Sequence, residues 1–224
     1  MDPSIPNGPW AHNAAQRWIK RAADATAAAV GLVAISPVLA ITAVAIRATM
    51  GSPVLFRQKR PGLGGRTFEL LKFRTMARAK QDDHAVDPST DAQRLTPVGK
   101  FLRDWSIDEL PQLVNVLRGD MSLIGPRPLL LQYLPRYSPE QARRHQMPPG
   151  ITGWAQINGR NSLSWDEKFA LDVWYIDRWS LWLDAKILLS TATRVLRRDG
   201  ISSAGHVTMP EFLGPNQQPR AAAP

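Results

Sequence analysis

The stretch RDWSIDELP, at positions 103–111, holds the side chains that are best suited to catalysis. Asp108 and Glu109 are adjacent carboxylates, and Arg103 precedes them by one turn. Two carboxylates beside cations suit phosphate chemistry with Mg²⁺, because one acid can attack or ligate phosphorus while the other holds the metal. A structural interpretation stays open, since Ser106 followed by Glu109 is also the pattern of a helix capping box.

Further basic residues can meet this acidic pair. Lys72 and Arg74 belong to a basic, β-rich segment, and Arg127 lies in a Gly-Pro-Arg-Pro turn. Guanidinium groups bind phosphate oxygens in a forked geometry, so Arg103 and Arg127 can neutralise the charge of a departing phosphate. We predict phosphate contact for all four residues. For Lys72 and Arg74 an ordinary basic strand surface, or contact with anionic lipid, stays open as an alternative.

Composition narrows the choice of partners and metals. The chain of 224 residues has a formal charge of +9, which favours nucleic acid, anionic lipid or phosphorylated substrates. No expected helix carries the concentrated basic face of a nucleic-acid module, so we expect no nucleic-acid partner. The absence of cysteine excludes disulfides, Fe–S clusters, thiolate zinc and a cysteine nucleophile. A metal should therefore have oxygen ligands, as Mg²⁺ does.

One apolar segment, at 22–46, contains a single formal charge, Asp24. As a straight helix it would be about 37 Å long, enough to cross a hydrocarbon core of about 30 Å. Pro37 lies near its middle and predicts a kink, and Ser36 can satisfy part of the freed backbone. Basic residues flank both ends, and positive charge favours the cytoplasmic side. We therefore predict a re-entrant membrane helix, broken at Ser36-Pro37.

Two other interpretations of this segment stay open: a single spanning helix and an alanine-rich core helix. A cleaved signal peptide is disfavoured, because the apolar run is too long and no small-residue cleavage site follows it. The chain then divides into an N-terminal arm at 1–16, the membrane helix at 17–50, a catalytic domain at 51–213 and a disordered tail at 214–224.

Turn and cap signals predict the elements that position these side chains. PGLGG between two β-rich runs indicates a hairpin. Thr96 and Pro97 are typical of a helix start, and Gly119 of a helix end. We expect an α+β fold, mainly helical, with a compact helical catalytic domain and Trp-rich amphipathic helices that serve the core or a membrane interface. The expected elements are a hairpin at 53–76, a loop at 79–94, helices at 97–105, 106–118, 164–176 and 181–198, a short helix within 134–150 and a glycine-rich loop at 150–161.

Three motifs in order carry a family resemblance: KFRTM at 72–76, DELPQLVNVLRGDMSLIGPRP at 108–128 and PGITGWAQINGRN at 149–161. They resemble the bacterial sugar transferase family, the monotopic phosphoglycosyl transferases that start glycan assembly on polyprenyl phosphate. The similarity runs from about residue 17 to residue 212. The ending GISSAGHVTMPEF is similar to that of the short members, most of all the undecaprenyl-phosphate diacetylbacillosamine 1-phosphate transferases.

The resemblance implies a role for each motif residue. Asp108 would attack the β-phosphate of a UDP-sugar, expected to carry an N-acetylated amino sugar, and release UMP. Glu109 matches the acid assigned to Mg²⁺, with Asp108 beside it as a second ligand. Gln156 and Arg160 would contact the uridine or the sugar, with support of a backbone turn as an equal alternative. Asp172 matches an acid near the site, and a salt bridge on a helix surface is equally open for it.

The resemblance also implies partners and a location. The partners would be a UDP-sugar, polyprenyl (undecaprenyl) phosphate and inner-membrane lipid, with the catalytic domain on the cytoplasmic face of the bacterial inner membrane. The oligomeric state stays open, and a homodimer is one alternative. Two other functions are kept in view: the same enzyme class using UDP-galactose or UDP-glucose, and a non-catalytic basic scaffold associated with the membrane.

Overall fold

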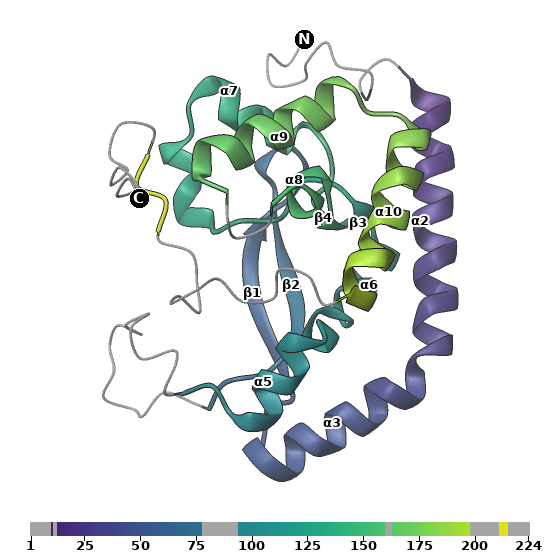
Figure 1. Ribbon diagram of the computed structural model, residues 1–224, viewed down its shortest axis with the longest axis vertical. Helices are drawn as coiled ribbons and strands as arrows, with labels where there is room; N and C mark the ends of the chain where they lie inside the picture. The colour runs from purple at the N-terminus through teal and green to yellow at the C-terminus, as the bar shows by residue number, and fades with distance from the viewer. Residues whose placement is uncertain (1–9, 11–12, 78–93, 160–162, 198–210, 215–224) are drawn as a thin grey trace.

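The computed structural model has a mainly helical α+β fold with two small sheets, which confirms the expected class (Figure 1). Arg160, the N-terminal arm up to residue 9, most of the expected loop at 79–94 and the tail beyond residue 214 lie outside the residues that the structure describes. The described residues are 10, 13–77, 94–159, 163–197 and 211–214.

The N-terminal segment forms two helices, α2 (Ala14–Ala34) and α3 (Ser36–Met50), which are bent by 62° relative to each other. Pro37 lies in the first turn of α3, and Ser36 donates its hydroxyl to the carbonyl of Val33 at 2.8 Å. The predicted break at Ser36-Pro37 is therefore confirmed. Within the described residues no single helix has the length and composition to cross a membrane, whereas this bent pair together does.

The first half of α2 is anchored in the protein by buried charged side chains. Lys20 contacts Asp184 of α10 (Leu181–Arg197) at 2.7 Å and Asp24 at 3.7 Å. Asp24 also accepts a hydrogen bond from the hydroxyl of Ser122 at 2.7 Å. Figure 1 shows α2 alongside α10, with α3 turning away toward α5. Lys20 thus belongs to an internal ion-pair network, and it is not simply part of a basic flank.

The expected hairpin is confirmed. Strands β1 (Leu55–Pro61) and β2 (Thr67–Phe73) pair antiparallel and are joined through the turn η1 (Leu63–Gly65). Two glycines of this turn have φ angles of 61° and 75°, which a residue with a Cβ rarely adopts. The glycines of PGLGG therefore make a turn, as the sequence indicates.

Two helices carry the acidic motif toward the hairpin. Thr96 caps α5 (Pro97–Asp104), and Gly119, with a φ of 93°, ends α6 (Gln112–Arg118), as predicted. Asn115 of α6 is fully buried, and its carboxamide accepts from a backbone N–H of β2 at 3.0 Å and donates to a carbonyl of β2 at 2.7 Å. This double contact fixes α6 against β2.

The single helix expected at 106–118 is wrong in its first half. Ser106 has a left-handed φ of 55°, and a 3-10 turn, η3 (Ile107–Glu109), follows it. Pro111 then separates η3 from α6. Because proline lacks the N–H that the helix ladder needs, a continuous helix is interrupted here.

The expected glycine-rich loop is also wrong over its first half. Its residues form β4 (Gly150–Thr152), which pairs parallel with β3 (Ser122–Ile124), and the short helix α8 (Trp154–Ile157). A Cβ on Gly150 would lie 2.1 Å from the backbone nitrogen of Gly125, so this glycine serves close backbone packing. The remaining elements are η4 (Leu131–Arg136), α7 (Pro139–Ala142), η5 (Arg143–Gln146) and α9 (Trp165–Asp177).

Aromatic residues near the C-terminus divide between the core and the surface. Trp165 and Trp179 are buried, whereas Trp182 of α10 is 79% exposed. Phe212 is fully buried against Tyr133 and Trp165, so the short described stretch at 211–214 is packed into the domain.

Candidate active site

Asp108 and Glu109 lie together on the turn η3, between α5 and α6. Only 8% of the surface of Asp108 is exposed. The capping-box interpretation is wrong, because the side chain of Ser106 makes no cap hydrogen bond and Glu109 contacts basic residues instead. The left-handed Ser106 and the following 3-10 turn hold both acids close to β2.

Glu109 is clamped by two cations from different elements. Its Oε1 atom accepts from Nζ of Lys72, on β2, at 2.7 Å and from Nη2 of Arg127, beyond β3, at 2.5 Å. Burial opposes the charge of Glu109, but Arg127 and Lys72 outweigh burial and hold the pKa of Glu109 well below its ordinary value. Glu109 raises the pKa of Arg127 in turn. Glu109 is therefore ionised at neutral pH.

Asp108 behaves differently from its neighbour. Burial, and then the charge of Glu109, raise the pKa of Asp108 to about 6, although Lys72, Arg103 and Arg127 act in the opposite direction. The pair thus combines one carboxylate that is ionised at neutral pH with one whose pKa is raised to about 6. Adjacent acids whose environments separate their pKa values are typical of catalytic sites.

Arg103 and Arg74, both predicted to bind phosphate, have different surroundings. Arg103 donates from Nε to the hydroxyl of Thr75 at 3.0 Å, and its charge acts on Asp108. Arg74 is buried and donates to the carbonyl oxygens of Met50 and Gly51, each at 2.6 Å. The described contacts of Arg74 therefore join the segment just after β2 to the end of α3. Its phosphate contact stays a prediction.

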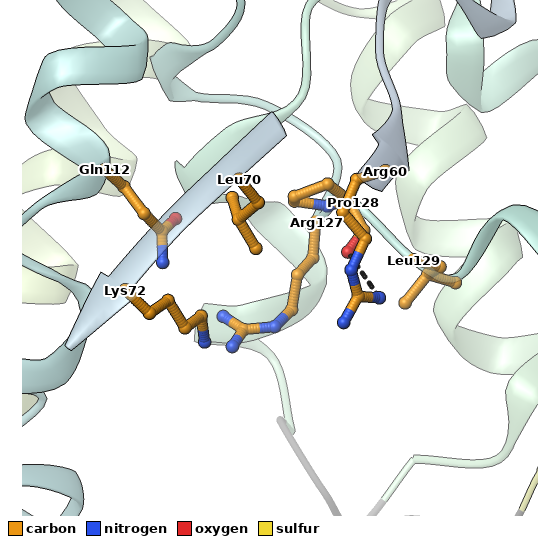
Figure 2. Close-up of a pocket in the computed structure, with 7 residues that line it drawn as sticks. All are labelled: Arg60, Leu70, Lys72, Gln112, Arg127, Pro128 and Leu129. Carbon is orange, nitrogen blue, oxygen red and sulfur yellow. Dashed lines mark hydrogen bonds between the residues drawn. The ribbon is translucent and has the colours of Figure 1, made fainter. Parts of the chain in front are cut away.

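A pocket of about 90 Å³ adjoins the clamp on Glu109. Lys72 and Arg127 contribute to its wall, and Figure 2 shows their charged ends pointing toward each other. Arg60 and Gln112 complete the polar part of the wall. The apolar part consists of Leu70, Pro128 and Leu129.

Asp172 is linked to this site through Arg144 and is not on a helix surface. It is buried on α9, and its Oδ2 atom accepts from Nη2 of Arg144 at 2.7 Å and from Nε at 3.1 Å. Arg144 also donates from Nη2 to the backbone carbonyl of Arg127 at 2.8 Å. The Asp172–Arg144 pair therefore supports the backbone that presents Arg127 to Glu109.

Gln156 lies on α8, where neither its amide nitrogen nor its amide oxygen has a hydrogen-bond partner in the described part of the chain. Both atoms are buried, so a bound ligand or a water is needed to satisfy them. This arrangement is compatible with the predicted ligand contact, which stays a prediction.

The structure adds basic residues that the motifs did not single out. Arg60 lines the pocket, and Lys168 of α9 lies close enough to Arg127 that burial and this charge lower the pKa of Lys168 to about 8. Pairing Arg60 with Phe68 across the hairpin places Arg60 on the same strand face as Lys72, a relation that the sequence could have indicated. No local signal identified Lys168 or Arg144.

The carboxylates of the site would bind Mg²⁺ only if a substrate phosphate supplied further ligands. No group of three or more His, Asp or Glu side chains in the described ranges is arranged to hold a metal. Mg²⁺ commonly binds through one or two carboxylates, with waters and substrate phosphates as its other ligands. Asp108 and Glu109, which are adjacent on η3, would supply the carboxylates that such an ion needs.

Comparison with known proteins identifies the family. Residues 15–198 match the family model described as bacterial sugar transferase. The chain belongs to this family. It is 54% identical to an uncharacterised sugar transferase of Bacillus subtilis, EpsL, over 88% of this chain and 96% of the relative. This sugar transferase is also 44% identical to the UDP-glucose:undecaprenyl-phosphate glucose-1-phosphate transferase of Caulobacter vibrioides, over 80% of this chain and 70% of that protein.

Other relatives are much longer. The galactosyl transferase CpsE of Streptococcus agalactiae is 44% identical over 81% of this chain, which spans only 43% of that protein. The shared region contains the acidic pair and the basic residues of the pocket, since the family match extends from α2 to the end of α10.

Proposed function

We propose that this sugar transferase moves a sugar 1-phosphate from a UDP-sugar to undecaprenyl phosphate and releases UMP. The observation that carries the proposal is the acidic pair: Asp108 is buried on the same turn as Glu109, which Lys72 and Arg127 clamp. Relatives named as UDP-glucose:undecaprenyl-phosphate glucose-1-phosphate transferases support the reaction class.

In the first half-reaction the carboxylate of Asp108 attacks the β-phosphorus of the UDP-sugar. A bond forms between phosphorus and the Asp108 oxygen, the bond to the bridging oxygen breaks, and its electron pair leaves with UMP. An oxygen of undecaprenyl phosphate then attacks the same phosphorus and releases the Asp108 carboxylate. Neither step needs a proton from the protein, and the covalent intermediate implies ping-pong kinetics.

Cations of this chain stabilise the charge that develops at phosphorus. Lys72, Arg103 and Arg127 surround the acidic pair, and charge-assisted hydrogen bonds from such groups are among the stronger ones in proteins. Glu109 and Asp108 would hold Mg²⁺ together with the diphosphate, and the ion would supply further charge neutralisation. The clamp fixes Glu109 before substrate arrives, so less reorganisation is needed.

We also propose that the bent pair α2–α3 enters the cytoplasmic leaflet of the bacterial inner membrane and returns, so that the catalytic domain stays on the cytoplasmic side. The apolar side chains of Val30, Val33, Ile41 and Val44 are between 64% and 77% exposed, as a lipid-facing surface requires. The buried ion pairs of Lys20 tie this element to the catalytic domain. In this arrangement the acidic pair would lie near the headgroups, where the acceptor phosphate is.

For the sugar there are three candidates. The C-terminal resemblance favours an N-acetylated amino sugar, whereas the names of several relatives specify glucose and the name of another specifies galactose. Specificity depends on a few polar contacts in the pocket that family motifs do not define. A panel of UDP-sugars distinguishes the candidates directly.

The test is UMP release by the purified protein with undecaprenyl phosphate and each UDP-sugar. Asp108→Asn should abolish both UMP release and the trapped phosphosugar adduct, while the protein stays in the membrane fraction. Asp104→Asn is the matched control, because Asp104 is an exposed acid paired with Lys100 on α5. Retained turnover in Asp108→Asn would exclude this residue as the nucleophile. Membrane binding by the wild type without any UMP release would favour the scaffold alternative.

A further inference from the structure

The pocket beside the acidic pair contains a cation that the mechanism above does not use. Arg60 donates to the carboxamide of Gln58 and, from Nη1, to the carbonyl of Pro128 at 3.4 Å. Its Nε atom is buried and has no hydrogen-bond partner among the described residues. Figure 2 shows the guanidinium of Arg60 reaching the pocket from the side opposite to Lys72.

The hairpin register directs Arg60 to this pocket. Gln58 pairs with Leu70 and Arg60 pairs with Phe68, so Arg60 lies on the strand face that also carries Leu70 and Lys72. Arg57 lies on the opposite face and makes an exposed ion pair with a glutamate of β2 at 3.2 Å. The two arginines of one strand therefore have different surroundings.

The pocket has an excess of positive charge. Arg60, Lys72 and Arg127 line it, and no acidic residue is among the described residues of its wall. Burial and the charge of Arg127 lower the pKa of Arg60 to about 10, so Arg60 still carries its charge at neutral pH. Glu109 contacts Lys72 and Arg127 but is not among the partners of Arg60 that the structure records. A bound anion would relieve this repulsion.

The size of the pocket suits one phosphoryl group. A volume of about 90 Å³ is several times what a single water needs, which is about 10–15 Å³ by a comparable measure. The forked donors of an arginine match the oxygens of a phosphate, whereas a lysine offers a point charge.

We propose that Arg60 forms, with Lys72 and Arg127, a subsite for a phosphate that is not the one under attack. The proposal rests on the proposed function. Two sources share this chemistry: the α-phosphate of the nucleoside diphosphate, which leaves as UMP, and the phosphate of the lipid acceptor. In either case Arg60 binds substrate and does not take part in bond formation.

The test compares Arg60→Met with Arg57→Met, which removes the same charge from the other face of the same strand. If the α-phosphate is the ligand, Arg60→Met should raise the KM for the UDP-sugar and lower UMP binding by about 10- to 100-fold, the effect expected for one hydrogen bond to a charged group. If the lipid phosphate is the ligand, the KM for undecaprenyl phosphate should rise instead, with an unchanged burst of UMP. Arg57→Met should change each quantity by less than about twofold.

Binding of UMP and of pyrophosphate, measured by titration calorimetry, separates failure of this proposal from failure of the proposed function. If the wild type releases no UMP from any UDP-sugar but Arg60→Met still weakens pyrophosphate binding, the proposed reaction is refuted and the proposed phosphate subsite is supported. If Arg60→Met leaves both KM values and both affinities unchanged, the subsite is refuted. Arg60→Lys, with an unchanged melting temperature, should show an intermediate loss and excludes misfolding as the cause.

Discussion

The separation of the two carboxylate pKa values predicts the pH dependence of the first half-reaction. Asp108 must be ionised to attack phosphorus, and its pKa is raised to about 6. The rate constant of the UMP burst should therefore be about 90% of its plateau at pH 7 and about 10% at pH 5. An aspartate with an ordinary pKa would still be more than about 90% ionised at pH 5.

The fall in burst rate at low pH is the acid limb of the pH profile, and its midpoint is the pKa of Asp108. Two substitutions should move this acid limb in opposite directions. Glu109→Gln removes a negative charge that raises the pKa of Asp108, so the limb should move to lower pH. Lys72→Met removes a positive charge that lowers the same pKa, so the limb should move to higher pH. Each shift should be on the order of one pH unit, because a charge a few ångströms away typically has an effect of that size.

The assay is a single-turnover burst of UMP without acceptor lipid, measured between about pH 4.5 and 8. Both variants should also be slower at the plateau, so the midpoint of the limb is compared and not the rate. Asp104→Asn should leave the midpoint unchanged. A wild-type midpoint below about pH 5, or a shift of both variants in one direction, would refute the electrostatic reasoning.

Three further predictions concern stability and topology. The folded-state pKa of Asp108 lies above its unfolded value, so its ionisation destabilises the fold increasingly as pH rises from about 4 to 6. Asp108→Asn should therefore raise the free energy of unfolding at pH 7 by at most about 3 kcal/mol, seen as a higher melting temperature, and leave it unchanged at pH 4. Asp172→Asn leaves Arg144 buried without its counter-ion, so thermal melts should show a loss of about 3 kcal/mol and the UMP burst should slow; removing Arg144 as well should restore stability but not the burst. Single cysteines at positions 12 and 56 should both resist an impermeant reagent applied to intact cells, and labelling of only one would mean that the helix pair spans the membrane.

Local signals predicted the elements whose stability is itself local. Thr96 caps α5 with its side chain, and the last two glycines of PGLGG, Gly64 and Gly65, occupy left-handed positions in the hairpin turn. The break before Pro37 follows from the missing N–H of proline. Each of these signals depends on a few neighbouring residues, so no tertiary information was needed.

Two predictions were wrong, the capping box at 106–109 and the first half of the glycine-rich loop at 150–161, because distant segments compete with local partners. Ser106 and Glu109 have the letters of a capping box, but Lys72 and Arg127 offer Glu109 two charged donors, which bind more strongly than a backbone N–H. The glycines at 150 and 153 led to the prediction of a loop, but their missing side chains permit close backbone contacts with Gly125. Neither outcome can be derived from neighbouring residues alone.

By itself the sequence determined the family, the acidic pair, the cations Lys72 and Arg127 and the break in the apolar segment, because each is a local pattern of residue types. Tertiary structure decided how those residues act. Folding buries Asp108 and leaves one carboxylate titrating near neutrality, and it turns Asp172 into a support for Arg127. The strand register brings Arg60 to the pocket. Desolvation and charge proximity depend on which distant segments pack together, and that is a property of the folded chain.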